Sequence, residues 1–197
     1  MEAARRERLA TGYRPRHGGL GRQDYLQLGA YWPVGGMSST ATDMARWMRF
    51  HLNGGELDGI RLLAPDTHAR MWQRAHHDRP DAADVAHGWQ DVPYRGLRTL
   101  GHGGGTAAFL THLVLVPELN LGVFVSQNST DSMVAITQLP TLLIDRLTGI
   151  DPVPLFIDDE DPEALAALAG SYRNNRRVFS SFAAVLKAIL GYGGIEG

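Results

Sequence analysis

The sequence predicts an α+β fold in which an antiparallel sheet is flanked by helices. Two runs rich in β-branched and large apolar residues, 109–116 and 121–126, have the composition of strands buried on at least one face. The segment 117–120 between them contains Pro and Asn, which favour a turn. Together with the stretch 98–105 in front of them, these runs predict an antiparallel meander at the centre of the chain.

A helix is predicted on either side of this meander in the sequence. Thr40 followed by Asp43 resembles a capping box, and the acid also suits the positive helix N-terminus. Asn53-Gly54-Gly55 ends this helix, and the later helix, 132–147, ends at Gly149. The later helix contains Pro140, for which we predict a kink. The first helix carries an apolar stripe at helical spacing, formed by Met44, Trp47, Met48 and Leu52.

Outside this centre the sequence has fewer periodic signals. Residues 1–36 contain many glycines and little periodicity, and we expect them to be irregular. The shorter elements predicted next are a tight turn at Asp58-Gly59, a helix from Pro65 to about Arg74, an exposed loop at 76–86 and a strand at 87–92.

The domain organisation is predicted from changes in composition. Residues 1–150 form the main domain, because they contain the meander and both long helices. A linker is predicted at 151–161, which begins with two prolines and ends in an acidic run. Residues 162–197 are predicted to be a helical tail or the start of a further domain.

The composition excludes several classes of function. The net charge is −2 with both signs well mixed, which argues against a nucleic-acid partner or an anionic membrane recognised by bulk electrostatics. No apolar run is long enough to span a bilayer, and the charged start of the chain is not a signal peptide. The absence of Cys excludes disulfides and thiolate metal sites but leaves the localisation unknown. Lys187 is the only lysine, so it is the only candidate for a catalytic lysine.

The densest glycine cluster surrounds His102, in Gly101-His102-Gly103-Gly104-Gly105. Glycines on a strand weaken it and mark close approach by a backbone or a ligand. His102 to Gly105 matches the HGGG oxyanion loop of lipases, but no G-x-S-x-G elbow follows; Gly36-Met37-Ser38 comes nearest, with Thr40 in place of the last glycine. The alternative is a purely structural role, in which the histidine is hydrogen-bonded within its strand.

Two other functional interpretations of histidine and glycine fit the sequence less well. A dinucleotide-binding loop would need a glycine at Thr106 and a helix after it, whereas a strand is predicted there. Metal binding would need ligands on one face of an element, which the spacing does not provide, so we predict no metal site. The metal candidates considered are His76, His77, Asp78 and His87.

An ordered set of motifs resembles the serine β-lactamase-related family, which includes class C β-lactamases and penicillin-binding-protein-like carboxypeptidases and esterases. The resemblance covers roughly residues 12–148. The motifs that carry it are the stretch 35–48, the Gly-Gly-Glu-Leu-Asp-Gly turn at 54–59, the Leu-Leu-Ala-Pro helix start at 62–65, the His-x-Gly motif at His102-Gly103-Gly104, and Asn128 after two strands.

The resemblance implies a serine hydrolase that forms a covalent acyl-enzyme with a small or peptide-like amide, ester or lactam, without a cofactor. His102 would lie beside the nucleophile as a polar, proton-handling or substrate-orienting group. The backbone N–H of Gly105 would be an oxyanion donor. Gly103 and Gly104 would bind substrate, with Gly104 allowing the acyl chain to lie against the strand.

The sequence departs from the family in its catalytic motifs. S-x-x-K requires a serine three residues before a lysine, but Ala184 stands three residues before Lys187. The only Y-x-N, Tyr172-Arg173-Asn174, follows His102, whereas the family places this motif earlier. We therefore expect the chain to be the C-terminal portion of such a hydrolase, lacking an N-terminal half and exposing apolar surface as a result. The alternative is a non-catalytic module that uses the strand to bind a ligand or peptide.

Overall fold

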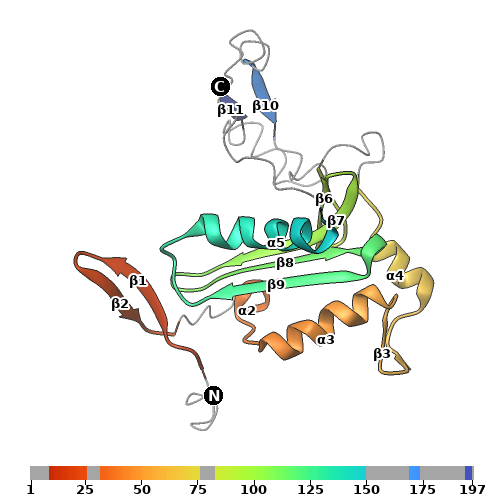
Figure 1. Ribbon diagram of the computed structural model, residues 1–197, viewed down its shortest axis with the longest axis horizontal. Helices are drawn as coiled ribbons and strands as arrows, with labels where there is room; N and C mark the ends of the chain where they lie inside the picture. Colours follow the sequence, from red (N-terminus) through yellow and green to blue (C-terminus); the bar gives the residue numbers. More distant parts are fainter. Residues whose placement is uncertain (1–8, 26–31, 76–82, 150–168, 174–193, 197) are drawn as a thin grey trace. The chain divides into compact units, whose positions relative to one another are not determined.

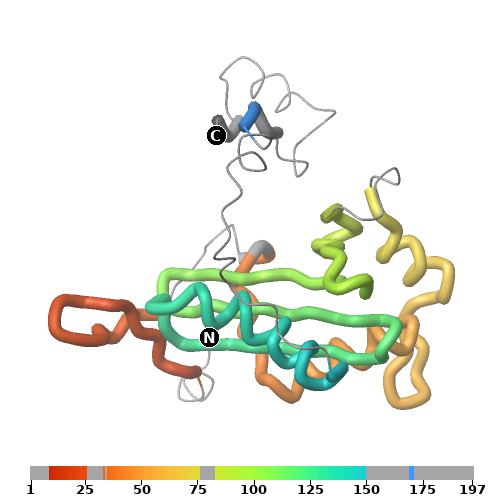
Figure 2. Tube along the Cα trace, turned by 45° about the horizontal axis from the view of Figure 1, so that its top comes forward, coloured from red at the N-terminus to blue at the C-terminus, as the bar shows by residue number. Residues whose placement is uncertain are grey.

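The computed structural model describes residues 9–25, 32–75, 83–149, 169–173 and 194–196 (Figures 1 and 2). The chain divides into two compact units, Met1–Asp151 and Pro152–Gly197. In the second unit β10 (Ser171–Arg173) pairs with β11 (Gly194–Glu196) in antiparallel orientation. The predicted linker, 151–161, and most of the predicted tail, 162–197, lie outside the described residues.

A five-stranded antiparallel sheet forms the centre of the first unit, and its strands follow one another in sequence order (Figure 1). The strands are β5 (Asp84–Val85), β6 (Gln90–Tyr94), β7 (Leu97–Gly105), β8 (Leu110–Val116) and β9 (Leu121–Gln127). Arg95 and Gly96 form the tight β6–β7 turn with φ of 50° and 79°. The 3₁₀ turn η2 (Pro117–Leu119) joins β8 to β9, which confirms the predicted meander.

One face of the sheet is covered by α3 (Ala41–Leu52). Its N-cap is the predicted one, because the Asp43 N–H donates to Thr40 Oγ1 over 3.1 Å. Met48 packs against Leu100 and Leu115, and it approaches the sheet closely because Gly122 has no side chain: a Cβ there would lie 2.9 Å from Met48 Sδ.

The predicted apolar stripe of this helix is partly wrong. Trp47 is 47% exposed, whereas His51, which was not predicted to be in the core, is fully buried. Its ring meets the rings of Trp47 and Trp89 edge-on, with centroids 4.4 and 4.9 Å apart. A turn of α3 therefore faces an aromatic cluster that the spacing of apolar residues does not reveal.

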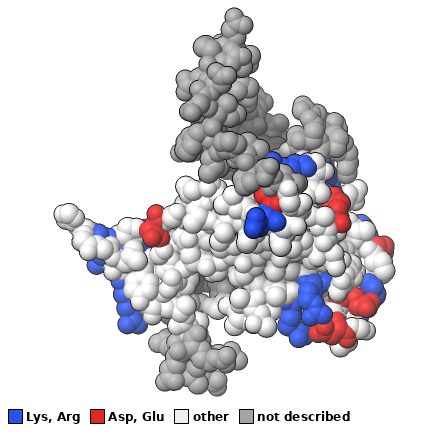
Figure 3. Space-filling view, in the orientation of Figure 1, with Lys and Arg blue, Asp and Glu red and all other residues white. Residues whose placement is uncertain are grey.

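The opposite face of the sheet is covered by α5 (Met133–Thr148), where Ile144 packs against Val114, Val116 and Val123 (Figures 1 and 2). Gly149 caps the helix at φ 72°, as predicted. Figure 3 shows a largely uncharged surface over α5 and the middle of this face. Apolar side chains of α5 are exposed, among them Leu139, Leu142, Leu143 and Leu147, and Val92 on β6 is exposed as well.

The N-terminal region differs from the expectation of irregular structure. β1 (Gly12–Arg16) and β2 (Gly19–Gln23) form a hairpin, and α2 (Trp32–Gly35) precedes α3. The hairpin is attached next to the end of β9: the Tyr13 N–H donates to the Asn128 carbonyl over 2.8 Å, and Asn128 Nδ2 donates to the Thr11 carbonyl over 2.9 Å. Main-chain hydrogen bonds stabilise this segment. Such bonds do not require an apolar pattern, so the polar, glycine-rich sequence did not predict the strands.

The remaining elements shift the predicted boundaries. The turn at Asp58-Gly59 is confirmed, with φ of 50° and 80°, between β3 (Glu56–Leu57) and β4 (Ile60–Arg61). α4 (Pro65–Met71) starts at the predicted proline but ends before Arg74. The predicted 76–86 loop contains β5, and residues 76–82 lie outside the described part of the chain. No helix among the described residues is long and apolar enough to cross a bilayer.

Candidate active-site wall

β7 changes its surroundings at Gly101. Its partner β6 pairs with it only as far as the Gln90–Gly101 pair, so that within the described residues His102 to Gly105 pair with β8 alone. Burial follows the pairing: Thr99 to Gly101 are buried and His102 to Gly105 are exposed. The predicted glycine cluster is therefore an open sheet edge.

The two turns that flank β7 determine which backbone groups face this edge. Across the two-residue β6–β7 turn, the backbone N–H and C=O groups of Leu97 face β6. At the other end of β7, the Thr106 N–H faces β8, because it donates to the Phe109 carbonyl across the β7–β8 turn over 2.8 Å. Because bonding directions alternate along an antiparallel strand, Gly101 bonds toward β6. The N–H and C=O groups of Gly103 and Gly105 consequently point to the open edge.

His102 lies on the same face of the sheet as Leu100 and Leu113, the face that α3 covers. Its side chain is exposed, and Nδ1 lies 2.7 Å from the Gly103 carbonyl oxygen. Because a carbonyl only accepts, we assign the proton to Nδ1, which leaves Nε2 of the neutral ring as an acceptor. The purely structural alternative, a histidine hydrogen-bonded within its strand, therefore accounts for Nδ1, whereas Nε2 stays available to a ligand.

The glycines of the edge have different structural reasons. A Cβ on Gly104 would lie 2.5 Å from Thr111 Oγ1, so a larger residue there would force the Thr111 side chain to move. A Cβ on Gly103 would meet nothing closer than the Thr111 carbonyl oxygen at 3.8 Å. Space beside Gly103 is therefore left open by the protein itself.

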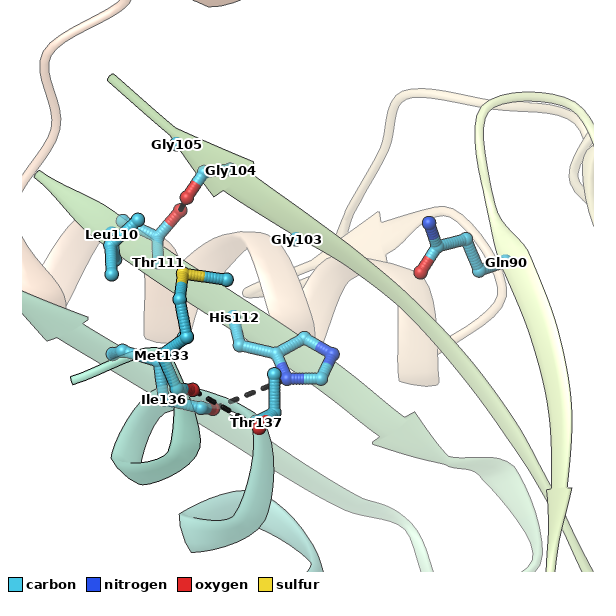
Figure 4. Close-up of a pocket in the computed structure, with 10 residues that line it drawn as sticks. All are labelled: Gln90, Gly103, Gly104, Gly105, Leu110, Thr111, His112, Met133, Ile136 and Thr137. Atoms are coloured by element: carbon cyan, nitrogen blue, oxygen red, sulfur yellow. Dashed lines mark hydrogen bonds between the residues drawn. The ribbon is translucent and has the colours of Figure 1, made fainter. Parts of the chain in front are cut away.

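That space belongs to a pocket of ≈ 290 Å³ on the α5 face of the sheet (Figure 4). His112 stands opposite Gly103 in the strand register, and its Nδ1 donates to the Ile136 carbonyl over 3.3 Å. Sequence reasoning missed this residue, although counting back from the β7–β8 turn pairs it with Gly103. The lining residues are Gln90, Gly103, Gly104, Gly105, Leu110, Thr111, His112, Met133, Ile136 and Thr137.

A charged cluster supports the buried half of β7. Arg98 on β7 and Asp91 on β6 form an ion pair of 2.7 Å, and Asp91 is fully buried. Arg74 reaches both Asp91 and the buried Asp84. These charges are paired with one another and fix β5, β6 and β7 together, and they lie outside the pocket beside Gly103.

Two buried histidines, His51 on α3 and His68 on α4, face each other. His51 Nδ1 and His68 Nε2 are 3.3 Å apart. Burial, and secondarily the neighbouring His68, lowers the pKa of His51 to about 4. Burial also lowers the pKa of His68, with a smaller contribution of the same sign from Arg61 and an opposing one from the hydrogen bond with His51. Both rings are therefore neutral near pH 7.

Metal ligation has no support in the described part of the chain, where no group of three or more His, Asp or Glu is arranged to hold an ion. Three of the candidates from the sequence, His76, His77 and Asp78, lie outside that part. The open edge and its pocket thus offer backbone groups, imidazole rings, the Gln90 amide and two threonine hydroxyls as their polar groups.

The described part of the chain is thus an α+β fold with helices on both faces of an antiparallel sheet and a glycine-rich open edge on β7. The family model for beta-lactamases matches residues 2–145, and the chain belongs to that family. This confirms the resemblance found in the sequence.

The chain is also similar to one relative in sequence and to one solved structure in fold. The chain is 28% identical over 147 residues to penicillin-binding protein 4 of Amycolatopsis lactamdurans. The matched region covers 71% of this chain and 39% of that protein. The fold of this chain is similar to that of the octameric penicillin-binding protein homologue from Pyrococcus abyssi, with a TM-score of 0.59 and 17% identity over 87% of this chain and 39% of the other. The chain therefore spans well under half the length of both.

Proposed function

We propose that this chain forms one wall of the acyl-enzyme site of a serine hydrolase that acts on an amide, ester or lactam. The observation that carries the proposal is the open edge of β7, where the Gly105 N–H points away from β8 in a chain of the beta-lactamase family. A backbone N–H held rigidly at a strand edge can stabilise an oxyanion without reorganising during the reaction.

Each residue of the edge has a role in this proposal. A serine Oγ attacks the substrate carbonyl carbon, and the Gly105 N–H donates to the oxygen that becomes negative. The tetrahedral intermediate then expels the leaving group, and water later hydrolyses the acyl-serine. Gly103 and Gly104 bind the substrate chain along the edge, and His102 orients it or transfers a proton through Nε2.

The serine, in this proposal, is supplied by a polypeptide segment other than these residues. Support comes from the sequence, in which S-x-x-K does not occur, and from the greater length of both relatives. The exposed leucines of α5 and the open side of β9 within the described sheet are surfaces that such a segment would cover.

The test is complementation. The purified chain is mixed with the part of penicillin-binding protein 4 that lies outside the matched region and treated with a fluorophosphonate. We expect labelling of a serine in the added part only when this chain is present. Stoichiometric labelling of this chain alone would show that the nucleophile is within it.

A matched pair of variants isolates the oxyanion donor in the same assay. Gly105→Pro removes the N–H and should slow acylation about 10²- to 10³-fold. Gly105→Ala keeps the N–H, and its Cβ would lie 3.3 Å from Leu110 Cδ2, so it should retain most of the rate. Equal rates for the two variants would exclude Gly105 as the donor.

The second candidate is a non-catalytic module that binds an extended peptide at the β7 edge. The same unpaired edge favours it, because strand addition needs only main-chain partners. Peptide binding without acylation in the complemented sample would support this function. An in-frame S-x-x-K and Y-x-N in the genomic DNA just upstream would exclude it.

A further inference from the structure

The pocket beside the open edge of β7 carries no Asp, Glu, Lys or Arg among its lining residues. Leu110 and Ile136 form an apolar floor and are 6% and 3% exposed. Met133, which is 57% exposed, lies at its rim on α5 (Figure 4). A flexible thioether beside an apolar floor can adapt to the shape of an apolar group.

Two side-chain donors of this pocket are used within the protein, and the Gln90 amide is a further, uncharged donor. The His112 Nδ1–H donates to the Ile136 carbonyl, and Thr137 Oγ1 lies 3.1 Å from the Met133 carbonyl, to which it donates. In the neutral His112 ring this leaves Nε2 as an acceptor. A carboxylate placed against the apolar floor would meet no Lys or Arg side chain among the lining residues and would lose hydration there.

We propose that the substrate is an uncharged ester or amide whose apolar substituent occupies this pocket. The inference rests on the proposed function, because it assigns the reacting carbonyl to the Gly105 N–H. The volume of ≈ 290 Å³ lies at the low end of small-molecule pockets, so the substituent is about the size of one ring or a short alkyl chain.

Binding of a matched probe pair to the chain alone tests this inference, because binding needs no nucleophile. The probes are N-benzoylglycine methyl ester and N-benzoylglycinate, which differ in the charge of one end. Titrations followed by backbone-amide NMR should show the ester shifting the signals of Gly103 to Gly105 and Thr111. We expect the ester to bind roughly tenfold or more tightly than the carboxylate.

Three variants make the test specific. Gly103→Val should abolish ester binding, because the added side chain fills the space beside Gly103, where a Cβ would have no atom nearer than the Thr111 carbonyl oxygen at 3.8 Å. Thr137→Arg adds a cation at the pocket and should reverse the preference toward the carboxylate. Leu139→Gln is the control: this exposed residue of α5 lies outside the pocket, and the change should leave both affinities unaltered.

The inference is overturned if the wild-type chain binds the carboxylate as tightly as the ester, or if millimolar ester leaves the β7 glycine signals unmoved. It is also overturned if Gly103→Val binds the ester like the wild type. These outcomes concern recognition alone. Failure of the proposed function would instead be a complemented sample that binds the ester selectively and forms no acyl-serine.

Discussion

The two halves of β7 have opposite surroundings on one continuous strand. Leu100 and Gly101 are buried, lie between β6 and β8, and are held by the core under α3. His102 to Gly105 are exposed and pair only with β8 among the described residues. The first half has the features of a structural strand, and the second those of a binding edge.

The difference between the halves indicates how a rigid strand can present an open edge. A sheet edge with free N–H groups would be mobile if nothing held it. Here the exposed glycines continue directly from a segment fixed by the core and by the Arg98–Asp91 ion pair. The buried half thereby orients the Gly103 and Gly105 backbone groups of the exposed half.

The largest expected effect comes from removing the core contact of the buried half. Leu100→Ala truncates a side chain that is 0% exposed, and it should lower the free energy of unfolding by about 3–5 kcal/mol. Urea denaturation followed by circular dichroism measures this. Leu62→Ala, at a position that is 67% exposed, is the control and should change it by less than about 0.5 kcal/mol. A similar loss in both variants would contradict the assigned difference in packing.

Lowering the pH should lower the free energy of unfolding through His51. The ring of His51 packs against Trp89, in the same core that holds the buried half of β7. The pKa of His51 is lowered in the folded state to about 4, so the unfolded state binds the proton more tightly. The contribution of the neutral His51 ring to the free energy of unfolding is fully present above pH 6.5 and is lost as the pH falls toward 4. The loss is roughly 2 kcal/mol at pH 5 and roughly 3 kcal/mol once the pH is below 4.

Denaturation at pH 7 and pH 5 checks this expectation. His51→Leu lacks the titrating group, so its stability should differ less between the two pH values than that of the wild type. An unchanged pH dependence in this variant would assign the effect to other groups, of which His68 is the nearest.

The smallest expected effect compares one glycine from each half. A Cβ on Gly101 would lie 2.5 Å from the Leu113 carbonyl oxygen, a backbone atom, so Gly101→Ala should cost about 1–3 kcal/mol. Gly103→Ala meets only an ordinary contact and should be neutral or slightly stabilising, by less than about 1 kcal/mol. Thermal unfolding of both variants measures the difference, and equal melting temperatures would refute the division at Gly101.

Much of the fold is predictable because its signals are local. The Thr40 cap, the Asp58-Gly59 turn and the Gly149 stop act over a few residues and are all present in the structure. The meander was recognisable from two apolar runs and the turn between them. The order of short motifs was sufficient to indicate the family, which the match over residues 2–145 shows.

The site was predictable only in part. His102 and the glycines were singled out by sequence, and their catalytic and binding roles stay predictions. Gln90, His112, Met133 and Thr137 were missed, because they come from three other elements that meet β7 only after folding. Likewise, the burial of His51 and the exposure of Trp47 depend on the aromatic residues that surround α3.

The sequence by itself therefore determined the Thr40 and Gly149 caps, the Asp58-Gly59 turn, the central meander and the place of the glycine cluster on a strand. Tertiary structure alone decided that the pairing of β7 with β6 ends at Gly101, that Gly103 faces a pocket without Asp, Glu, Lys or Arg, and that α5 exposes leucines. The physical reason is the range of the interactions. Caps and turns involve neighbours in sequence, whereas pairing and burial depend on strands and helices brought together from distant parts of the chain.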